Sequence, residues 1–295
     1  MKIVIFIISF SILIFFFGCS KDTMAMKDDL QHPDSSFLPV IFLCGQSNME
    51  GVQIDASLPG QFKNNIPNAY IFFKPTNTAA NDGSVQTLKY GLNNNWRNPA
   101  IYFGPETGMA YYLTQAGHRI AIVKYAYGGS KLSFTGTPDQ YGYWQVNATD
   151  SLNHYNILIN NWARQSMVEF RKAGFKPYIA AMVWCQGETD AHDLSAAREY
   201  EKNLTQLLNK FKADLSQTDS LVNNMRVIIT STGNSFPYSD IIRKAQKHIA
   251  NSYLNGYLIN SDGWQLGQGG VHYTSTTEAE FHGKAIADIL LRVIP

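Results

Sequence analysis

A serine near the start of the chain and a histidine near its end have the surroundings expected of a nucleophile and its general base. Ser47 lies in the segment Gly45–Gly51, directly after an apolar run that ends at Cys44. A serine at such a turn from strand to helix can expose its hydroxyl, although serine is also a common helix N-cap. His272 lies in the glycine-rich segment Gly269–Ser275. Acyl transfer uses this pair of residue types, because the imidazole takes the proton when the hydroxyl attacks a carbonyl.

Two further segments offer hydrogen-bond donors for the oxyanion that such an attack creates. Gly128 follows the apolar run that ends at Ala126, and its backbone N–H is unobstructed by a side chain. Gln186 follows the run that ends at Cys185 and adds a side-chain amide. With the N–H of Ser47, these groups make three donors of the kind that an oxyanion hole needs. Because the carboxyl ends of parallel strands share one edge of a sheet, we expect the three segments to converge.

The other histidines are weaker candidates for the base. His282 competes with His272, but it lies on an apolar stripe of the last predicted helix, which is typical of core packing. The remaining five lie in an N-terminal tether, in turns or on polar helical faces, namely His32, His118, His154, His192 and His248. We therefore expect His272 to be the base.

Continuous apolar runs alternate with segments of helical period along the chain. The runs are typical of strands covered on both faces and comprise Leu38–Cys44, Ala69–Phe73, Arg119–Ala126, Tyr178–Cys185 and Met225–Ser231. The helical segments are Glu106–Gln115, Ser151–Lys172, Leu194–Leu215, Tyr238–Asn251 and a last helix for which Ser275–Glu278 fits a capping box. This alternation favours parallel crossovers and predicts an α/β fold, a three-layer α/β/α sandwich around a central parallel sheet.

Two stretches, 74–99 and 131–150, lack a clear period and predict irregular excursions. The second carries four aromatic residues among Gly and Thr, namely Phe134, Tyr141, Tyr143 and Trp144. Aromatic side chains on a loop of a rigid scaffold can hold a sugar ring. They can equally well pack the loop onto the domain, and the sequence leaves both interpretations open.

The N-terminus predicts export. Residues 1–19 combine Lys2, an apolar run and a small residue before Cys19, which is the pattern of a signal peptide. The end of this run resembles a bacterial lipobox, in which the cysteine becomes the lipidated first residue. An ordinary signal peptide with an incidental cysteine is the alternative. Residues 20–36 are polar and predict a flexible tether to a domain over 37–295. We expect an exported bacterial lipoprotein, periplasmic or at the cell surface, anchored in the membrane at Cys19.

Charge and cysteine usage limit the kinds of ligand. The 24 Lys and Arg residues nearly balance the 23 Asp and Glu residues, so no strong field favours nucleic acid or an anionic membrane surface. The histidines and cysteines lack metal-ligand spacing, and we expect neither a metal nor a cofactor, and no protein partner. Cys44 and Cys185 end apolar runs, which favours buried free thiols over a disulfide.

The order of the motifs resembles a known family. Gly-Gln-Ser-Asn-Met at Ser47, Tyr-Gly-Gly-Ser at Gly128, Gln-Gly-Glu-Thr-Asp at Gln186 and Val-His-Tyr at His272 are similar to the sialate O-acetylesterase and acetyl-xylan esterase branch of the SGNH hydrolases, which is like carbohydrate esterase family 6. The resemblance covers nearly the whole domain and implies an SGNH fold, related to that of flavodoxin. It also implies a serine esterase that removes acetyl groups from oligo- or polysaccharides without a cofactor.

The resemblance leaves the acid of a catalytic triad unassigned. Such enzymes usually have an Asp two or three residues before the catalytic histidine, where this chain has Gly270 and Gly269. A backbone carbonyl could orient His272 in a Ser-His dyad, or a carboxylate from elsewhere could do so. Glu188 and Asp262 are the possible orienting acids.

A catalytically silent protein of the same fold is the alternative to an esterase. Without the expected acid, the chain could be a surface lipoprotein that binds glycans through the same cleft. Ser47, Gln186 and His272 argue for the enzyme, because a protein that only binds needs neither a nucleophile nor a base.

Overall fold

The computed structural model describes residues 37–54, 58–74, 83–90, 92, 102–134, 140–148, 150–267 and 269–295. The predicted signal peptide, Cys19 and the tether over 20–36 lie outside the described residues, as does most of the stretch 74–99. Among the described helices, none is both long and apolar enough to cross a bilayer.

A seven-stranded sheet forms the centre of the domain. Its strands lie in the order β4-β3-β6-β1-β7-β8-β9, and every neighbouring pair is parallel except β3 and β4. The strands are β1 (Phe37–Gly45), β3 (Asn65–Phe73), β4 (Ser84–Lys89), β6 (Ile120–Ala126), β7 (Lys176–Cys185), β8 (Arg226–Thr230) and β9 (Gly256–Ile259). A separate two-stranded sheet pairs β2 (Gln53–Ile54) with β5 (Tyr102–Phe103).

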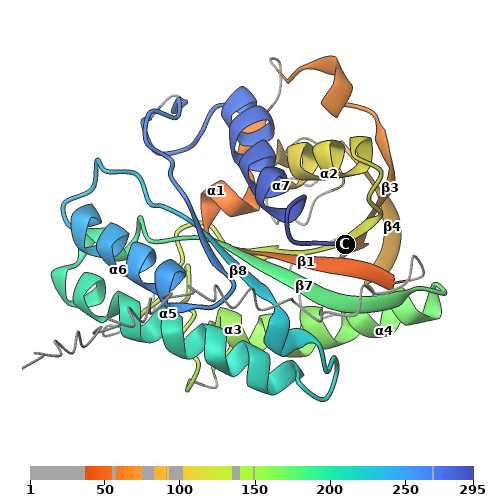
Figure 1. Cartoon of the computed structure of the whole chain (residues 1–295). Coiled ribbons are helices and arrows are strands. Elements are labelled where there is room, and N and C mark those ends of the chain that lie inside the picture. Colours follow the sequence, from red (N-terminus) through yellow and green to blue (C-terminus); the bar gives the residue numbers. More distant parts are fainter. Residues whose placement is uncertain are drawn as a thin grey trace, which may run out of the picture. The chain divides into compact units, whose positions relative to one another are not determined.

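Helices cover both faces of the large sheet (Figure 1). The helices on one face are α3 (His154–Ile157), η2 (Leu158–Ala163), α4 (Arg164–Lys172), α5 (Leu194–Leu215) and α6 (Ser239–Ser252). The other face packs against α2 (Glu106–Gln115), η5 (Thr277–Gly283) and α7 (Lys284–Leu290). The described residues also form four short helices: α1 (Ser47–Glu50), η1 (Gly60–Phe62), η3 (Asp190–His192) and η4 (Val222–Asn224). The predicted three-layer α/β/α architecture is confirmed.

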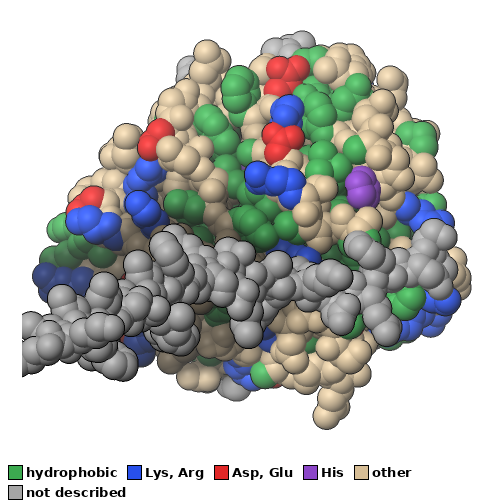
Figure 2. Space-filling model, viewed as in Figure 1, with side chains coloured by type: hydrophobic (Ala, Val, Ile, Leu, Met, Phe, Trp, Pro, Cys, Tyr) green, Lys and Arg blue, Asp and Glu red, His purple; other side chains and the backbone are tan. Residues whose placement is uncertain are grey.

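Burial on both faces explains why β1 is apolar throughout. Val40, Phe42 and Cys44 pack into the core on the α5 side, whereas Ile41 and Leu43 pack into the core on the α2 side. Successive side chains of a strand point to opposite faces, so a strand between two layers needs apolar residues at every position. Figure 2 shows acidic, basic and hydrophobic side chains interspersed on one face of the molecule.

The five predicted strands are all present in the seven-stranded sheet, but its two edge strands were missed, as were β2 and β5 of the small sheet. β4 and β9 lie at the two edges of the sheet and are only partly buried, so neither has the continuous apolar run of an interior strand. β4 lies within the stretch 74–99, and predicting an irregular excursion there was wrong for Ser84–Lys89. Cys44 and Cys185 are buried free thiols, as predicted.

The predicted capping box at Ser275–Glu278 is wrong. The hydroxyl of Thr274 accepts the N–H of Thr277 at 3.2 Å, and the Thr274 carbonyl accepts that of Glu278 at 2.9 Å. The carboxylate of Glu278 instead lies 3.1 Å from Nδ1 of His282, one helical turn later. The capping side chain is therefore that of Thr274, one residue before the predicted Ser275.

Two histidines are buried in the core. His282 was expected there, and its Nε2 lies 2.9 Å from the hydroxyl of Thr230. His154 was grouped with histidines of the tether, turns and polar helical faces, which is wrong: it is buried, and its ring lies 2.8 Å from the Tyr125 hydroxyl and 2.7 Å from the Tyr141 carbonyl. Both rings satisfy their nitrogens inside the protein, as buried polar groups generally do.

We predict that the burial of these two histidines makes the domain less stable in mild acid. Burial lowers the pKa of His154 to about 4 and that of His282 to about 3, from an ordinary value of 6.5. At these two residues the unfolded chain therefore binds more protons than the folded one below pH 6.5. The stabilisation from the neutral rings is complete above pH 6.5 and declines as the pH falls towards 4 and below, by up to about 1.4 kcal/mol per pH unit for each ring.

Urea unfolding of the wild type and of His282→Asn at pH 7, 6 and 5 measures this effect. We expect the free energy of unfolding of the variant to fall less steeply with decreasing pH. His248→Gln is the matched control, because it replaces a histidine that is exposed on α6 and not buried. Parallel pH profiles for the wild type and His282→Asn would contradict the prediction.

Candidate active site

Ser47 lies where β1 ends and α1 begins. The preceding Gly45 has a φ of 143°, and a Cβ atom there would overlap the carbonyl oxygen of Cys185, so only glycine fits. The N–H of Gln46 donates to that same carbonyl at 2.9 Å, and its side-chain oxygen accepts the N–H of Gly187 at 3.1 Å. The turn that carries the serine is thereby fixed to the end of β7.

The structure brings Ser47 and His272 together. Nε2 of His272 lies 3.0 Å from Oγ of Ser47, and the imidazole is only half-buried. The histidine's loop folds back on itself, because the Gly267 N–H donates to the His272 carbonyl at 2.7 Å and the Thr274 N–H to the Gln265 carbonyl at 3.0 Å. An imidazole at this distance can accept the proton of the hydroxyl as the oxygen attacks a carbonyl.

The two possible orienting acids each have another partner. Glu188 is buried, and its Oε1 accepts the side-chain amide of Asn48 at 3.0 Å. Asp262 forms a bidentate ion pair with Arg243, with distances of 2.8 and 2.9 Å. Arg243 also donates to the Thr232 carbonyl at 2.6 Å, so Asp262 and Arg243 join the ends of β8 and β9.

The two other predicted oxyanion donors already have acceptors within the protein. The N–H of Gly128 donates to Oε2 of Glu50 at 2.8 Å. The amide nitrogen of Gln186 donates to Oδ2 of Asp190 at 2.6 Å and to the Ser130 carbonyl at 3.2 Å. Gly128 and Gln186 therefore lie near the predicted site, but a substrate oxygen would have to replace an existing acceptor at each. Their role in an oxyanion hole stays a prediction.

Sequence reasoning did not single out Glu50 as part of this site. It is fully buried three residues after Ser47, on the same short helix α1, and accepts the Gly128 N–H across from β6. A glutamate within the mostly uncharged segment Gly45–Gly51 was the available signal, because an acidic side chain is rarely buried without a specific partner.

Asp190 holds the aromatic loop against the site. Its carboxylate accepts the N–H of Leu132 at 2.8 Å and both the N–H and the hydroxyl of Ser133. Of the four aromatic residues predicted for this loop, Tyr143 and Trp144 are buried, whereas Phe134 and Tyr141 are 41% and 39% exposed. Packing onto the domain is thus confirmed for Tyr143 and Trp144, whereas a sugar-binding role of Phe134 and Tyr141 stays a prediction.

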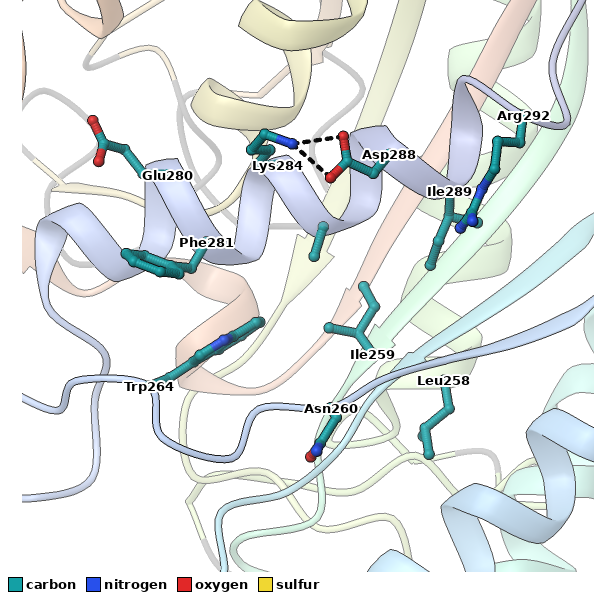
Figure 3. Close-up of a pocket in the computed structure, with 11 residues that line it drawn as sticks. Leu258, Ile259, Asn260, Trp264, Glu280, Phe281, Lys284, Asp288, Ile289 and Arg292 are labelled. Carbon is teal, nitrogen blue, oxygen red and sulfur yellow. Dashed lines mark hydrogen bonds and ion pairs between the residues drawn. The ribbon is translucent and has the colours of Figure 1, made fainter.

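A surface groove of about 530 Å³ adjoins the histidine's loop (Figure 3). It runs between β9 and the helices η5 and α7, with Trp264 and Phe281 at one end and the Lys284–Asp288 ion pair on its rim. The Trp264 ring lies 5.2 Å from that of Tyr273, the neighbour of His272. The aromatic end of the groove therefore lies beside the segment that carries the imidazole.

Comparison with known proteins gives the family. The family model described as "Carbohydrate esterase, sialic acid-specific acetylesterase" matches residues 38–292. An Arabidopsis thaliana protein named "Probable carbohydrate esterase At4g34215" is 29% identical over 123 residues, which cover 42% of this chain and 44% of that protein. The matched segment thus spans less than half the length of this relative.

Solved structures share the fold. The crystal structure of the same Arabidopsis thaliana protein has a TM-score of 0.66 at 20% identity and covers 87% of this chain and 99% of its own. The crystal structure of NanS has a TM-score of 0.64 at 16% identity, and the match covers 87% of this chain and 98% of the NanS chain. The crystal structure of a carbohydrate acetylesterase from Xanthomonas citri has a TM-score of 0.54 at 18% identity, and the match covers 87% of this chain and 56% of that protein's chain.

These neighbours confirm the α/β fold that was predicted from the sequence. The matched family model spans nearly the whole described domain, including the Ser47–His272 contact. The chain therefore belongs to the carbohydrate esterase, sialic acid-specific acetylesterase family of carboxylic ester hydrolases.

Proposed function

We propose that the protein removes O-acetyl groups from carbohydrate, with Ser47 as the nucleophile and His272 as the general base. The observation that carries the proposal is the 3.0 Å contact between Oγ of Ser47 and Nε2 of His272 at the carboxyl edge of the sheet. Membership of the carbohydrate esterase family supports the reaction class. A glycan-binding protein without activity would gain nothing from this contact.

The reaction proceeds through an acetyl-enzyme. Ser47 Oγ bonds to the acetyl carbonyl carbon as its proton moves to Nε2 of His272, and a tetrahedral oxyanion forms. Collapse of this intermediate breaks the bond to the sugar oxygen, which takes the proton from Nε2. A water molecule then attacks the acetyl-enzyme, His272 accepts the water's proton, and the return of that proton to Ser47 releases acetate.

The oxyanion is stabilised by the N–H of Ser47, with Gly128 and Gln186 as the further donors. The Ser47 N–H lies in the first turn of α1, where backbone N–H groups lack an intrahelical acceptor. Gln186 keeps one amide hydrogen on Asp190 and exchanges its longer, 3.2 Å bond to the Ser130 carbonyl for the oxyanion. The N–H of Gly128 likewise exchanges its hydrogen bond to Glu50 for one to the oxyanion.

The substrate is an acetylated sugar of the acetyl-xylan or O-acetyl sialic acid type. The family description names a sialic acid-specific acetylesterase, and the Arabidopsis thaliana and Xanthomonas citri proteins are named as a probable carbohydrate esterase and a carbohydrate acetylesterase. Phe134 and Tyr141 support a sugar ligand, because exposed aromatic rings on a fixed loop offer stacking surfaces.

Substitution of either member of the pair tests the chemistry. Ser47→Ala and His272→Ala should each lower kcat on p-nitrophenyl acetate by more than about 10³-fold, because the residues act as a unit. Circular dichroism checks that both variants fold. Ser252→Ala and His248→Gln, both on α6, are the matched controls and should keep wild-type activity.

The same assay on acetyl-xylan, O-acetyl sialic acid and p-nitrophenyl esters of increasing chain length defines the substrate. We expect acetyl esters to be preferred and at least one acetylated carbohydrate to be hydrolysed. Full activity in either alanine variant would refute the proposed chemistry. A preference for long acyl chains would refute the acetyl specificity.

We also propose that the mature protein is an exported lipoprotein anchored at Cys19, with residues 20–36 as its tether. The lipobox-like end of the apolar run supports this. Full-length protein from a bacterial host should partition into the detergent phase of a Triton X-114 extract, whereas Cys19→Ser should move to the aqueous phase. Equal partitioning of the two proteins would count against lipidation.

A further inference from the structure

We propose that Asn48, supported by Glu188, is the positioning residue that holds His272 against Ser47 in place of the missing aspartate. This inference rests on the proposed function, because it concerns how the general base is fixed. The side-chain hydrogen bonds of Asn48 go to Glu188 and to the backbone of Val271 and Tyr273. It acts through the peptide groups on either side of His272.

The histidine's segment needs such a support. Gly269 and Gly270 precede it with φ values of 96° and 68°, and nothing lies within 4 Å of the position that a side chain would occupy at either residue. Glycine has more backbone freedom than any other residue, so this part of the loop does not fix the imidazole by itself. Val271 is also exposed, which leaves little packing on that side.

Asn48 bridges the residues that flank His272. Its side-chain nitrogen donates to the Val271 carbonyl at 3.3 Å, and its side-chain oxygen accepts the N–H of Tyr273 at 3.2 Å. Both contacts span more than 200 residues of chain, and Asn48 is only 2% exposed. One amide group thus fixes the backbone before and after the base.

Glu188 determines which way the amide of Asn48 points. Its Oε1 accepts the second hydrogen of the Asn48 nitrogen at 3.0 Å, which directs the amide oxygen to Tyr273. Glu188 lies directly after Gly187, whose N–H is bonded to the side chain of Gln46. The acid therefore joins the segment after β7 to the histidine's loop through Asn48.

The position of Asn48 in the sequence links the base to the nucleophile. Ser47 and Asn48 are consecutive residues of α1, so the same rigid turn carries the hydroxyl and the amide. A displacement of the histidine's loop relative to Ser47 must break the bonds to Asn48 as well. A misplacement of about 1 Å can cost about 10²-fold in rate, so this support affects kcat.

Variants of Asn48 and Glu188 test the inference with p-nitrophenyl acetate. Asn48→Ala should lower kcat by about 10²-fold with KM within about twofold of the wild type, because the base is misplaced and the acyl pocket is intact. Asn48→Asp should lower kcat similarly, because it places a second carboxylate against Glu188. Glu188→Ala should lower kcat, and Glu188→Gln should restore most of the loss because it keeps an acceptor for Asn48.

Arg243→Ala is the matched control, because Arg243 also joins loops at this edge of the sheet, but does so through Thr232 and Asp262. It should leave kcat unchanged. A crystal structure of Asn48→Ala gives a readout that does not depend on activity: the His272 ring should have moved away from Ser47. An unmoved ring, or a kcat near that of the wild type, would overturn the inference. An inactive wild type with a displaced ring in the variant would reject only the proposed function.

Discussion

The proposed active site depends on one hydrogen bond between the two ends of the domain. Ser47 follows the first strand of the domain and His272 precedes its last helices, and their side chains meet at 3.0 Å. Neither residue has catalytic power alone at neutral pH, because a serine hydroxyl needs an adjacent base. The parallel sheet makes this contact possible. Ser47 follows the central strand β1 and His272 lies in the segment after β9, and the carboxyl ends of both strands lie at the same edge, where the loops after β6 and β7 also lie.

Buried polar groups keep that edge in shape. Glu50, Glu188 and Asp190 are each buried and each accept hydrogen bonds from a neighbouring loop. Burial raises the pKa of Glu188 and Asp190, whereas the donors around them counteract this effect. Removal of one partner from such a network leaves an unsatisfied buried group, which costs more than the bond itself contributes. The loops at this edge of the sheet therefore depend on all of these hydrogen bonds together.

The sequence was most informative about the interior of the domain. An interior strand such as Leu38–Cys44 is apolar at every position, so its pattern identifies it without knowledge of its neighbours. The motifs around Ser47 and His272 likewise indicated two residues that the structure brings into contact. Both signals are local, since they need only a short stretch of chain.

Features that depend on distant partners could not be predicted. The burial of His154 rests on Tyr125 and on the Tyr141 carbonyl, and nothing in the local pattern reveals either contact. The edge strand β9 lacks a distinctive apolar run because one of its sides has no neighbouring strand. The bond from Gly128 to Glu50 was also missed, because a backbone N–H leaves no trace in the sequence.

Covalent labelling of the folded wild-type protein with a fluorophosphonate tests the central claim most directly, because this probe reacts with a serine that a neighbouring base activates. Mass spectrometry should find one adduct per chain, on the peptide that contains Ser47, and the reaction should be much slower in His272→Ala. No adduct on Ser47, or equally fast labelling without the imidazole, would contradict the account.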